Sequence, residues 1–111
     1  GHLSEMLRGS GCGVSLRLKE IPLLPGALLM AKQGVASSLQ AANALALADF
    51  TLAADLDTER LGLLSDPQTS GGLLASVPAL RADACLEALQ AQQIDAARIG
   101  EIVPASNCLI I

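Results

Sequence analysis

Aromatic side chains are almost absent from these 111 residues, which contain one Phe and no Tyr or Trp. The core must therefore be built from Leu, Ile, Val and Ala, and the aromatic platforms that stack single-stranded bases are lacking. Basic residues are also few, because seven Lys and Arg stand against eleven Asp and Glu, a net charge of −4. Without a basic stripe to follow a phosphate backbone, we expect no nucleic-acid partner.

Long apolar runs and paired cysteines are lacking as well. No apolar run reaches the roughly 18 residues that span a bilayer, and no basic segment precedes one, so we expect neither a membrane partner nor a signal peptide. Cys12, Cys85 and Cys108 are odd in number and far apart, which favours a reducing, cytoplasmic location. Apolar residues still make up 51% of the chain, with a mean hydropathy of +0.49. Part of this apolar surface is expected to meet a partner or a missing domain.

The length suits one domain over residues 1–111. Leu3, Met6 and Leu7 have helical spacing and predict an opening helix. Because this helix begins abruptly, with no initiator Met, we expect the chain to be cut from a longer protein. Strict alternation over residues 14–19 predicts a half-buried strand.

The next segment predicts two helices. Residues 26–33 form a short apolar helix, and Gly34 suits the left-handed position just past its end. Ser37 and Gln40 have the spacing of a capping box, which predicts a second helix through residues 41–48.

The remaining elements alternate between helix and strand. We expect loop and turn at 50–60, short apolar elements at 61–64 and 72–77, a helix at 78–92, and strands at 99–103 and 108–111 around a turn at 104–107. Because helices and strands alternate without the spacing of a dinucleotide-binding fold, the predicted class is an α+β layered domain.

A dense polar turn between two apolar runs is the main candidate for a binding site. Its candidate ligand-binding residues are Asp66, Gln68, Thr69, Ser70, Gly71 and Gly72. Consecutive backbone N–H groups in a glycine-rich turn can form an anion nest, since glycine adopts positive φ without strain. The carboxylate and amide oxygens in the turn could hold Mg²⁺.

A purely structural role explains the same turn. Asp66 and Pro67 are typical turn openers, and the two glycines could only allow close packing at the start of a buried strand. The turn contains no phosphate-binding loop motif and no Lys. From spacing alone the structural role is favoured, because turn chemistry is common.

The other polar candidates carry less. His2 is the single histidine and has no Cys or Asp spaced to complete a zinc site with it. Cys12 has no cationic neighbour in sequence to activate it. Acidic residues 55–59 are typical of a solvated loop, and Asn43 either joins a local network or faces water. We therefore expect no catalytic residue and no metal site within this chain.

Residues 66–74, DPQTSGGLL, resemble a signature in the C-terminal domain of selenophosphate synthetases (selenide, water dikinases). Four other stretches resemble this domain in the same order, and the resemblance is weakest over residues 36–60. They are residues 1–6 (GHLSEM), 21–27 (IPLLPGA), 34–35 (GV) with Asn43, and 99–103 (IGEIV).

This resemblance implies a fold and an activity. The fold is the C-terminal domain of the aminoimidazole ribonucleotide synthetase type, a sheet packed with helices and partly ferredoxin-like. The full-length enzyme makes selenophosphate from selenide, ATP and water, releases AMP and phosphate, and uses Mg²⁺. The nucleophilic Cys or selenocysteine and most metal and ATP ligands belong to the family's N-terminal domain. This chain alone is thus expected to be inactive and to bind no cofactor tightly.

The resemblance also implies partners and leaves alternatives. We expect this domain to meet its own N-terminal domain, with residues 66–72 near the cleft between them, in a homodimeric full-length enzyme. The family's VPGG loop reads VASS at residues 35–38, which changes that loop. The alternatives are another ATP-using enzyme of the same superfamily, or a non-catalytic interaction module.

Overall fold

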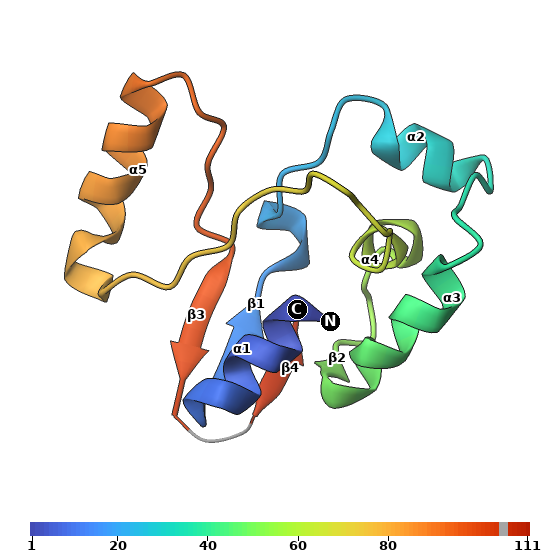
Figure 1. Ribbon diagram of the computed structural model, residues 1–111, viewed down its shortest axis with the longest axis horizontal. Helices are drawn as coiled ribbons and strands as arrows, with labels where there is room; N and C mark the ends of the chain where they lie inside the picture. The colour runs from blue at the N-terminus through green and yellow to red at the C-terminus, as the bar shows by residue number, and fades with distance from the viewer. Residues whose placement is uncertain (105–106) are drawn as a thin grey trace.

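The computed structural model describes residues 1–104 and 107–111 and shows a mixed α/β arrangement (Figure 1). In chain order, the elements are α1 (His2–Ser10), β1 (Gly13–Leu16), the 3₁₀ helix η1 (Leu18–Glu20), α2 (Ala27–Lys32), α3 (Gln40–Asn43), the 3₁₀ helix η2 (Ala44–Asp49), β2 (Thr51–Leu52), α4 (Thr58–Leu63), the 3₁₀ helix η3 (Ala79–Arg81), α5 (Ala82–Ala91), β3 (Gly100–Val103) and β4 (Cys108–Ile110).

Four strands form one mixed sheet in the order β2-β4-β1-β3. β1 is antiparallel to β3 and parallel to β4, and β4 is parallel to β2. Val14 lies opposite Ile102 on one side and Cys108 on the other, which sets the register. A four-stranded sheet packed with helices confirms the expected fold class.

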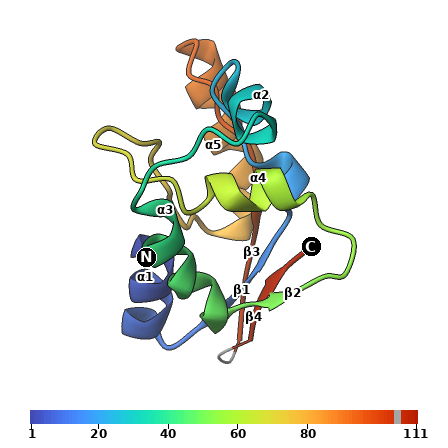
Figure 2. The ribbon, with the colours of Figure 1, turned by 90° about the vertical axis from the view of Figure 1, so that its right-hand side faces the viewer.

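The core lies between α1 and one face of the sheet (Figure 2). Val14 and Leu16 point to the same face because alternate strand residues do so. They pack with Leu7 of α1, and Leu18 and Ile110 complete the buried cluster. Each of these five side chains is at most 5% exposed. Aliphatic residues therefore fill the core, as the lack of aromatics required.

The opening helix is confirmed as α1, which ends where glycine permits it. Gly11 adopts the left-handed conformation at φ 62°. Its backbone N–H caps the end of the helix by donating toward the carbonyls of Arg8 and Leu7. The short apolar helix is confirmed as α2, and Gly34 after it has φ 77°, as expected. The strand predicted over 14–19 is half right, because β1 ends at Leu16 and the chain then turns into η1.

The capping-box prediction is wrong. The Ser37 hydroxyl accepts from the backbone N–H of Leu39, at 3.2 Å, and α3 begins only at Gln40. The Gln40 side chain does not return to Ser37 but donates to the carbonyl of Gly62. The predicted helix at 41–48 is a short α-helix that tightens into 3₁₀ geometry, α3 followed by η2.

The segment expected to be loop at 50–60 contains the short edge strand β2 and the start of α4. Residues 61–63 belong to α4 and Leu64 directly follows it, so no separate apolar element forms there. The signal was local: the Asp57 carboxylate accepts from the backbone N–H of Arg60 and caps the helix.

The apolar element expected at 72–77 has no regular secondary structure, and all six residues are exposed. The helix predicted at 78–92 divides into η3 and α5, which stand away from the sheet (Figure 1). The two closing strands are confirmed as β3 and β4. The turn predicted at 104–107 includes Ala105 and Ser106, which lie outside the described residues.

Candidate functional site

The candidate turn begins just after α4 and runs toward α5 as an extended coil (Figure 1). Asp66 is half-buried, and Gln68, Thr69, Ser70, Gly71 and Gly72 are all exposed. The structure therefore keeps the six predicted residues together in one loop. Their polar groups face outward, where a ligand or another part of a larger protein could reach them.

Inside the loop, Gln68 and Gly71 are in close contact. A Cβ atom on residue 71 would lie 2.7 Å from Oε1 of Gln68, the end of a flexible and exposed side chain that a small shift would move aside. Around Gly72 there is open space within 4 Å. The left-handed conformation on which we based an anion nest is absent here, because positive φ angles in the described residues occur at other positions. Those positions are Gly11, Gly26, Gly34 and Gln93.

Two side-chain amides of α3 hold the chain where it enters this loop. Nε2 of Gln40 donates to the carbonyl oxygen of Gly62 at 2.8 Å. Nδ2 of Asn43 donates to the carbonyl oxygen of Ser65 at 3.1 Å, one residue before Asp66. Asn43 fills both of the roles left open for it, because it joins this local hydrogen-bond network and is also exposed to solvent.

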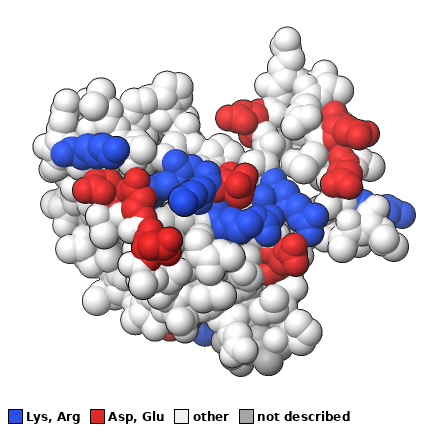
Figure 3. Space-filling model, turned by 180° about the vertical axis from the view of Figure 1, so that it is seen from behind, with Lys and Arg blue, Asp and Glu red and all other residues white. Residues whose placement is uncertain are grey.

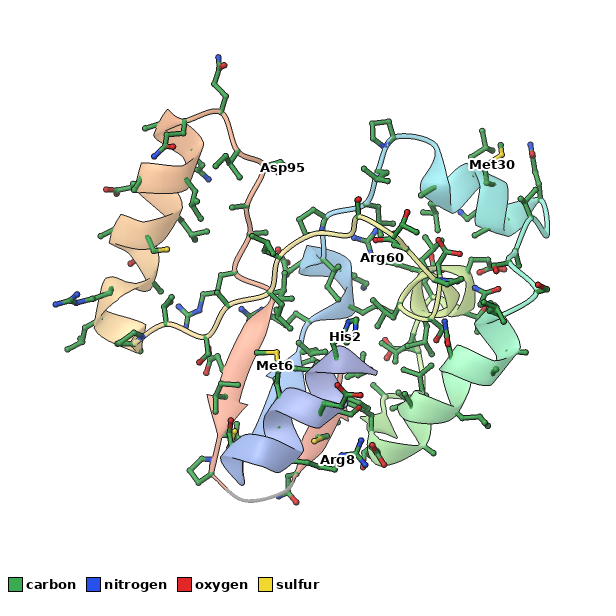
Figure 4. The ribbon with its side chains drawn as sticks, in the orientation of Figure 1. His2, Met6, Arg8, Met30, Arg60 and Asp95 are labelled. Atoms are coloured by element: carbon green, nitrogen blue, oxygen red, sulfur yellow. The ribbon has the colours of Figure 1, made fainter. Side chains whose placement is uncertain are left out.

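The Arg60 side chain, labelled in Figure 4, links α4 by hydrogen bonds to residues 18–21, which follow β1. Its Nε donates to the Leu18 carbonyl at 2.8 Å, and its Nη2 donates to the carbonyls of Lys19 at 2.9 Å and Ile21. This residue was missed from the sequence. Its signal was its isolation, since it is the one basic residue between Lys32 and Arg81.

The acidic residues near α4 serve the helix rather than a metal. Oδ1 of Asp57 accepts the backbone N–H of Arg60 at 2.8 Å, and this hydrogen bond lowers the pKa of Asp57 below its usual 3.8. Oε2 of Glu59 accepts the hydroxyl of Thr58 at 3.1 Å. Across residues 1–104 and 107–111, no group of three or more His, Cys, Asp and Glu could hold a metal ion.

The minor candidates lie apart from the loop entrance. His2 is exposed at the start of α1, where Figure 4 labels it. Cys12, Cys85 and Cys108 are all half-buried free thiols, and Cys12 and Cys108 pack against the core cluster.

Lys and Arg side chains lie in a broken row across the back of the molecule, interleaved with acidic side chains (Figure 3). Glu101 pairs with Arg98 at 3.0 Å and with Arg17 at 3.7 Å. A nearby hollow of about 320 Å³ is lined by Arg17 and Lys19 but also by Glu20 and Asp55. Charges of both signs neutralise one another on this face, so it does not form a uniform anion-binding patch.

A second hollow, of about 460 Å³, lies between α2, α3 and α4. Its wall is mostly small and apolar, and it includes Gln40, Gly62 and Ser65 from the entrance of the candidate loop. Val35 and Ala36, from the segment that departs from the family pattern, also line it. The candidate loop thus starts at the rim of a shallow apolar cleft.

These residues do not form a complete site for Mg²⁺ or for a polyphosphate. Within the loop, Asp66 supplies one carboxylate and Gln68 one amide oxygen, so a Mg²⁺ ion held there would need substrate phosphates, water or other residues to complete its ligands. No Lys or Arg occurs from residue 61 to residue 80 to neutralise a phosphate. The loop can offer hydroxyl groups and backbone N–H donors to a ligand that other residues also hold.

Among the helices that the structure describes, none combines the length and the apolar character needed to cross a membrane.

Comparison with protein families gives a match along almost the entire chain. The family described as "AIR synthase related protein, C-terminal domain" matches residues 1–109. The chain belongs to this family. The match agrees with the resemblance found in residues 66–74, which is confirmed.

Three relatives of this AIR synthase related domain are named selenide, water dikinase. The chain is 39% identical over 103 residues to "Selenide, water dikinase" of Myxococcus xanthus (strain DK1622), covering 92% of this chain and 29% of the relative. It is 44% identical over 89 residues to the protein of that name in Rhizobium meliloti (strain 1021), covering 78% and 25%. It is 36% identical over 112 residues to the protein of that name in Clostridium botulinum (strain Eklund 17B / Type B), covering 100% of this chain and 32% of the relative. The domain therefore spans about three tenths of the length of these relatives.

Proposed function

We propose that residues 1–111 form the C-terminal domain of a selenide, water dikinase. The full-length enzyme would make selenophosphate from selenide, ATP and water and release AMP and phosphate. The observation that carries this proposal is the match to the Myxococcus xanthus relative, which covers 92% of this chain at 39% identity.

The loop at residues 66–72 is proposed to help form the substrate cleft between this domain and the rest of the enzyme. Its polar residues after Asp66 are exposed, and the chain just before it is hydrogen-bonded to Gln40 and Asn43 of α3. Leu73 follows directly and is fully exposed, at 103%. An exposed leucine beside exposed hydroxyl groups suits a surface that another part of the protein covers.

The chemical step is assigned to residues outside this chain. The loop lacks a cation for phosphate groups and has one carboxylate, so the nucleophile and the ligands of Mg²⁺ and of the ATP phosphates would come from the preceding domain. The loop would contribute hydrogen-bond donors that orient a bound substrate. The proposal also includes a homodimeric full-length enzyme in the cytoplasm.

The experiment measures selenide-dependent AMP formation by the full-length protein that carries this chain, with ATP and Mg²⁺. We expect activity that requires selenide. ATP consumption independent of selenide would indicate another enzyme of the superfamily, and no ATP consumption would indicate an interaction module. The 111-residue chain alone should release no AMP, and selenide-dependent release by it would contradict the assigned division of labour.

The loop itself is tested with the Gln68→Ala/Thr69→Ala double variant of the full-length protein. We expect kcat/KM to fall about tenfold, because removing hydrogen bonds to substrate costs roughly 1.4 kcal/mol or more of transition-state stabilisation. The matched control is Gln90→Ala/Gln92→Ala, which alters two exposed amides at the end of α5. Wild-type kcat and KM in the loop variant would show that the loop is scaffold only.

A further inference from the structure

Two matched hydrogen bonds join α3 to the end of α4. The donors, Gln40 and Asn43, are three residues apart, and so are the acceptors, Gly62 and Ser65. Residues three apart lie on the same face of a helix, so one turn of α3 faces the last turn of α4 and the turn after it. The side-chain amides of Gln40 and Asn43 therefore donate to two backbone carbonyls that are about one helical turn apart, those of Gly62 and Ser65.

The two acceptors differ in position relative to the helix end. Gly62 lies inside α4, and its carbonyl also accepts the backbone N–H of Ser65 at 3.0 Å. Ser65 lies beyond the last helical residue, Leu63, and immediately before Asp66. The Gln40 contact thus holds the helix, whereas the Asn43 contact holds the first step of the chain out of it.

The Ser65 carbonyl belongs to a buried residue, with 5% of Ser65 exposed. Carbonyl groups past the end of a helix have no partner within it, and a buried one without a partner costs stability. Asn43 supplies that partner from a neighbouring helix. From residue 67 to residue 77 every residue is exposed, so Ser65 is the last buried position before the loop, and the backbone N–H of Asp66 donates to the Leu63 carbonyl at 3.2 Å.

We propose that Asn43 is a positioning residue for the loop at residues 66–72, and that Gln40 stabilises the helix end without directing the loop. Asn43 does not touch substrate. It holds the Ser65 carbonyl, fixes the exit of the chain from α4, and so places the hydroxyl and amide groups of the loop. This inference rests on the proposed function of the loop in the substrate cleft.

The test compares Asn43→Asp with Gln40→Glu in the full-length protein that carries this chain. Each change keeps the side-chain shape, adds one negative charge, and replaces an N–H donor by a carboxylate oxygen that repels the carbonyl. Three measurements are made on each variant. They are the kinetics of selenide-dependent AMP formation (KM and kcat), the thermal unfolding temperature, and hydrogen exchange of the backbone in residues 64–72.

For Asn43→Asp we expect about a tenfold rise in KM with kcat changed less than about twofold, because the loop orients substrate and does not perform the chemical step. Exchange in residues 64–72 should accelerate. For Gln40→Glu we expect a loss of thermal stability similar to that of Asn43→Asp, but a KM within about twofold of wild type. Unchanged KM and unchanged exchange in Asn43→Asp, or equal kinetic effects in both variants, would overturn the inference.

Failure of this inference is separable from failure of the loop's proposed function. Faster exchange with wild-type KM would confirm the anchoring by Asn43 and refute the role of the loop in the cleft. Unchanged exchange together with a raised KM in Gln68→Ala/Thr69→Ala would keep the loop's role and refute the anchoring. If the charged variants do not fold, Asn43→Ala and Gln40→Ala remove the same donors without adding charge, and the same expectations apply.

Discussion

Two regions of this molecule differ in whether they contain a buried apolar cluster, although both expose large apolar side chains. The sheet body, residues 1–65, 100–104 and 107–111, buries Leu7, Val14, Leu16, Leu18 and Ile110 in one cluster. The arm, residues 66–99, leaves Leu73 and Leu80 fully exposed and buries Ala82 alone. The arm's α5 has its main contacts with η3, which is also in the arm.

The difference shows that apolar composition does not by itself bury a residue. Strand pairing in the sheet body brings distant segments together, as where β1 pairs with β3 and β4. The arm has no strand, so its leucines meet few partners within this chain. Its exposed apolar surface is therefore available to the rest of a longer protein.

The comparison is tested most strongly by leucine truncation in the two regions. Leu18→Ala removes a side chain that is 1% exposed and should lower the free energy of unfolding by about 2–5 kcal/mol, from lost burial and the cavity left behind. Leu80→Ala, at a residue 101% exposed, should leave it unchanged. Urea unfolding of the 111-residue chain measures both. A loss of similar size at Leu80 would mean that the arm packs as tightly as the body.

The next largest loss of stability is expected when the hydrogen bonds of the Arg60 side chain are removed. Arg60→Ala removes the donor to three backbone carbonyls and should cost about 2–3 kcal/mol of unfolding free energy, because hydrogen bonds to a charged group are strong. Arg60→Lys keeps the charge but loses the planar fork, so it should restore only part of the loss.

The control for Arg60 is Arg98→Ala, which removes an exposed ion pair with Glu101. Its cost should stay below about 1 kcal/mol, because exposed pairs contribute little. Thermal unfolding of the three variants ranks them. Equal shifts of Tm in Arg60→Ala and Arg98→Ala would show that the Arg60 hydrogen bonds stabilise the fold no more than an exposed ion pair does.

Substitution of one glycine in each region tests how closely the backbone is packed there. A Cβ atom at Gly100 of β3 would meet the Ser15 carbonyl oxygen and lie 3.1 Å from Cα of Leu16, so Gly100→Ala should cost about 1–3 kcal/mol. Gly72 in the arm has open space around it, and Gly72→Ala should be tolerated. Chemical denaturation of both variants decides, and a tolerated Gly100→Ala would imply a looser β1–β3 pair.

The smallest expected effect concerns the cap of α4. The hydrogen bond from the backbone N–H of Arg60 lowers the pKa of Asp57 in the folded chain, so the stabilisation is fully present above the unfolded value of 3.8. It is lost as pH falls through the lower folded pKa. Asp57→Ala should lower Tm by a few degrees at pH 7 and by less near pH 2, whereas an equal loss at both pH values would exclude the carboxylate as the cause.

Local signals in the sequence predicted much of the sheet body. Helical spacing found α1, and glycines that need positive φ marked the ends of α1 and α2. Alternating or continuous apolar runs found β1, β3 and β4. These signals succeed because each depends on neighbours within a few residues.

Predictions failed where distant residues decide the structure. The Gln40 amide binds Gly62 instead of capping its own helix, and Arg60 binds carbonyls about forty residues earlier in the chain. The apolar segment at 72–77 looked like a strand, but a strand requires a partner and this segment has none in the arm. For the candidate loop, the sequence identified the residues as a group, and the anchor at Asn43 became visible only in three dimensions.

The place of β4 in the sheet has a consequence for how the domain is made. β4 begins at Cys108, yet it lies between β2 and β1 and joins both of them. During synthesis, more than a hundred residues must leave the ribosome before the sheet can close, and such distant pairings fold slowly. Until then the strand edges of β1 and β2 that pair with β4 lack their partner, so the nascent chain is exposed to aggregation and to chaperone binding at this stage.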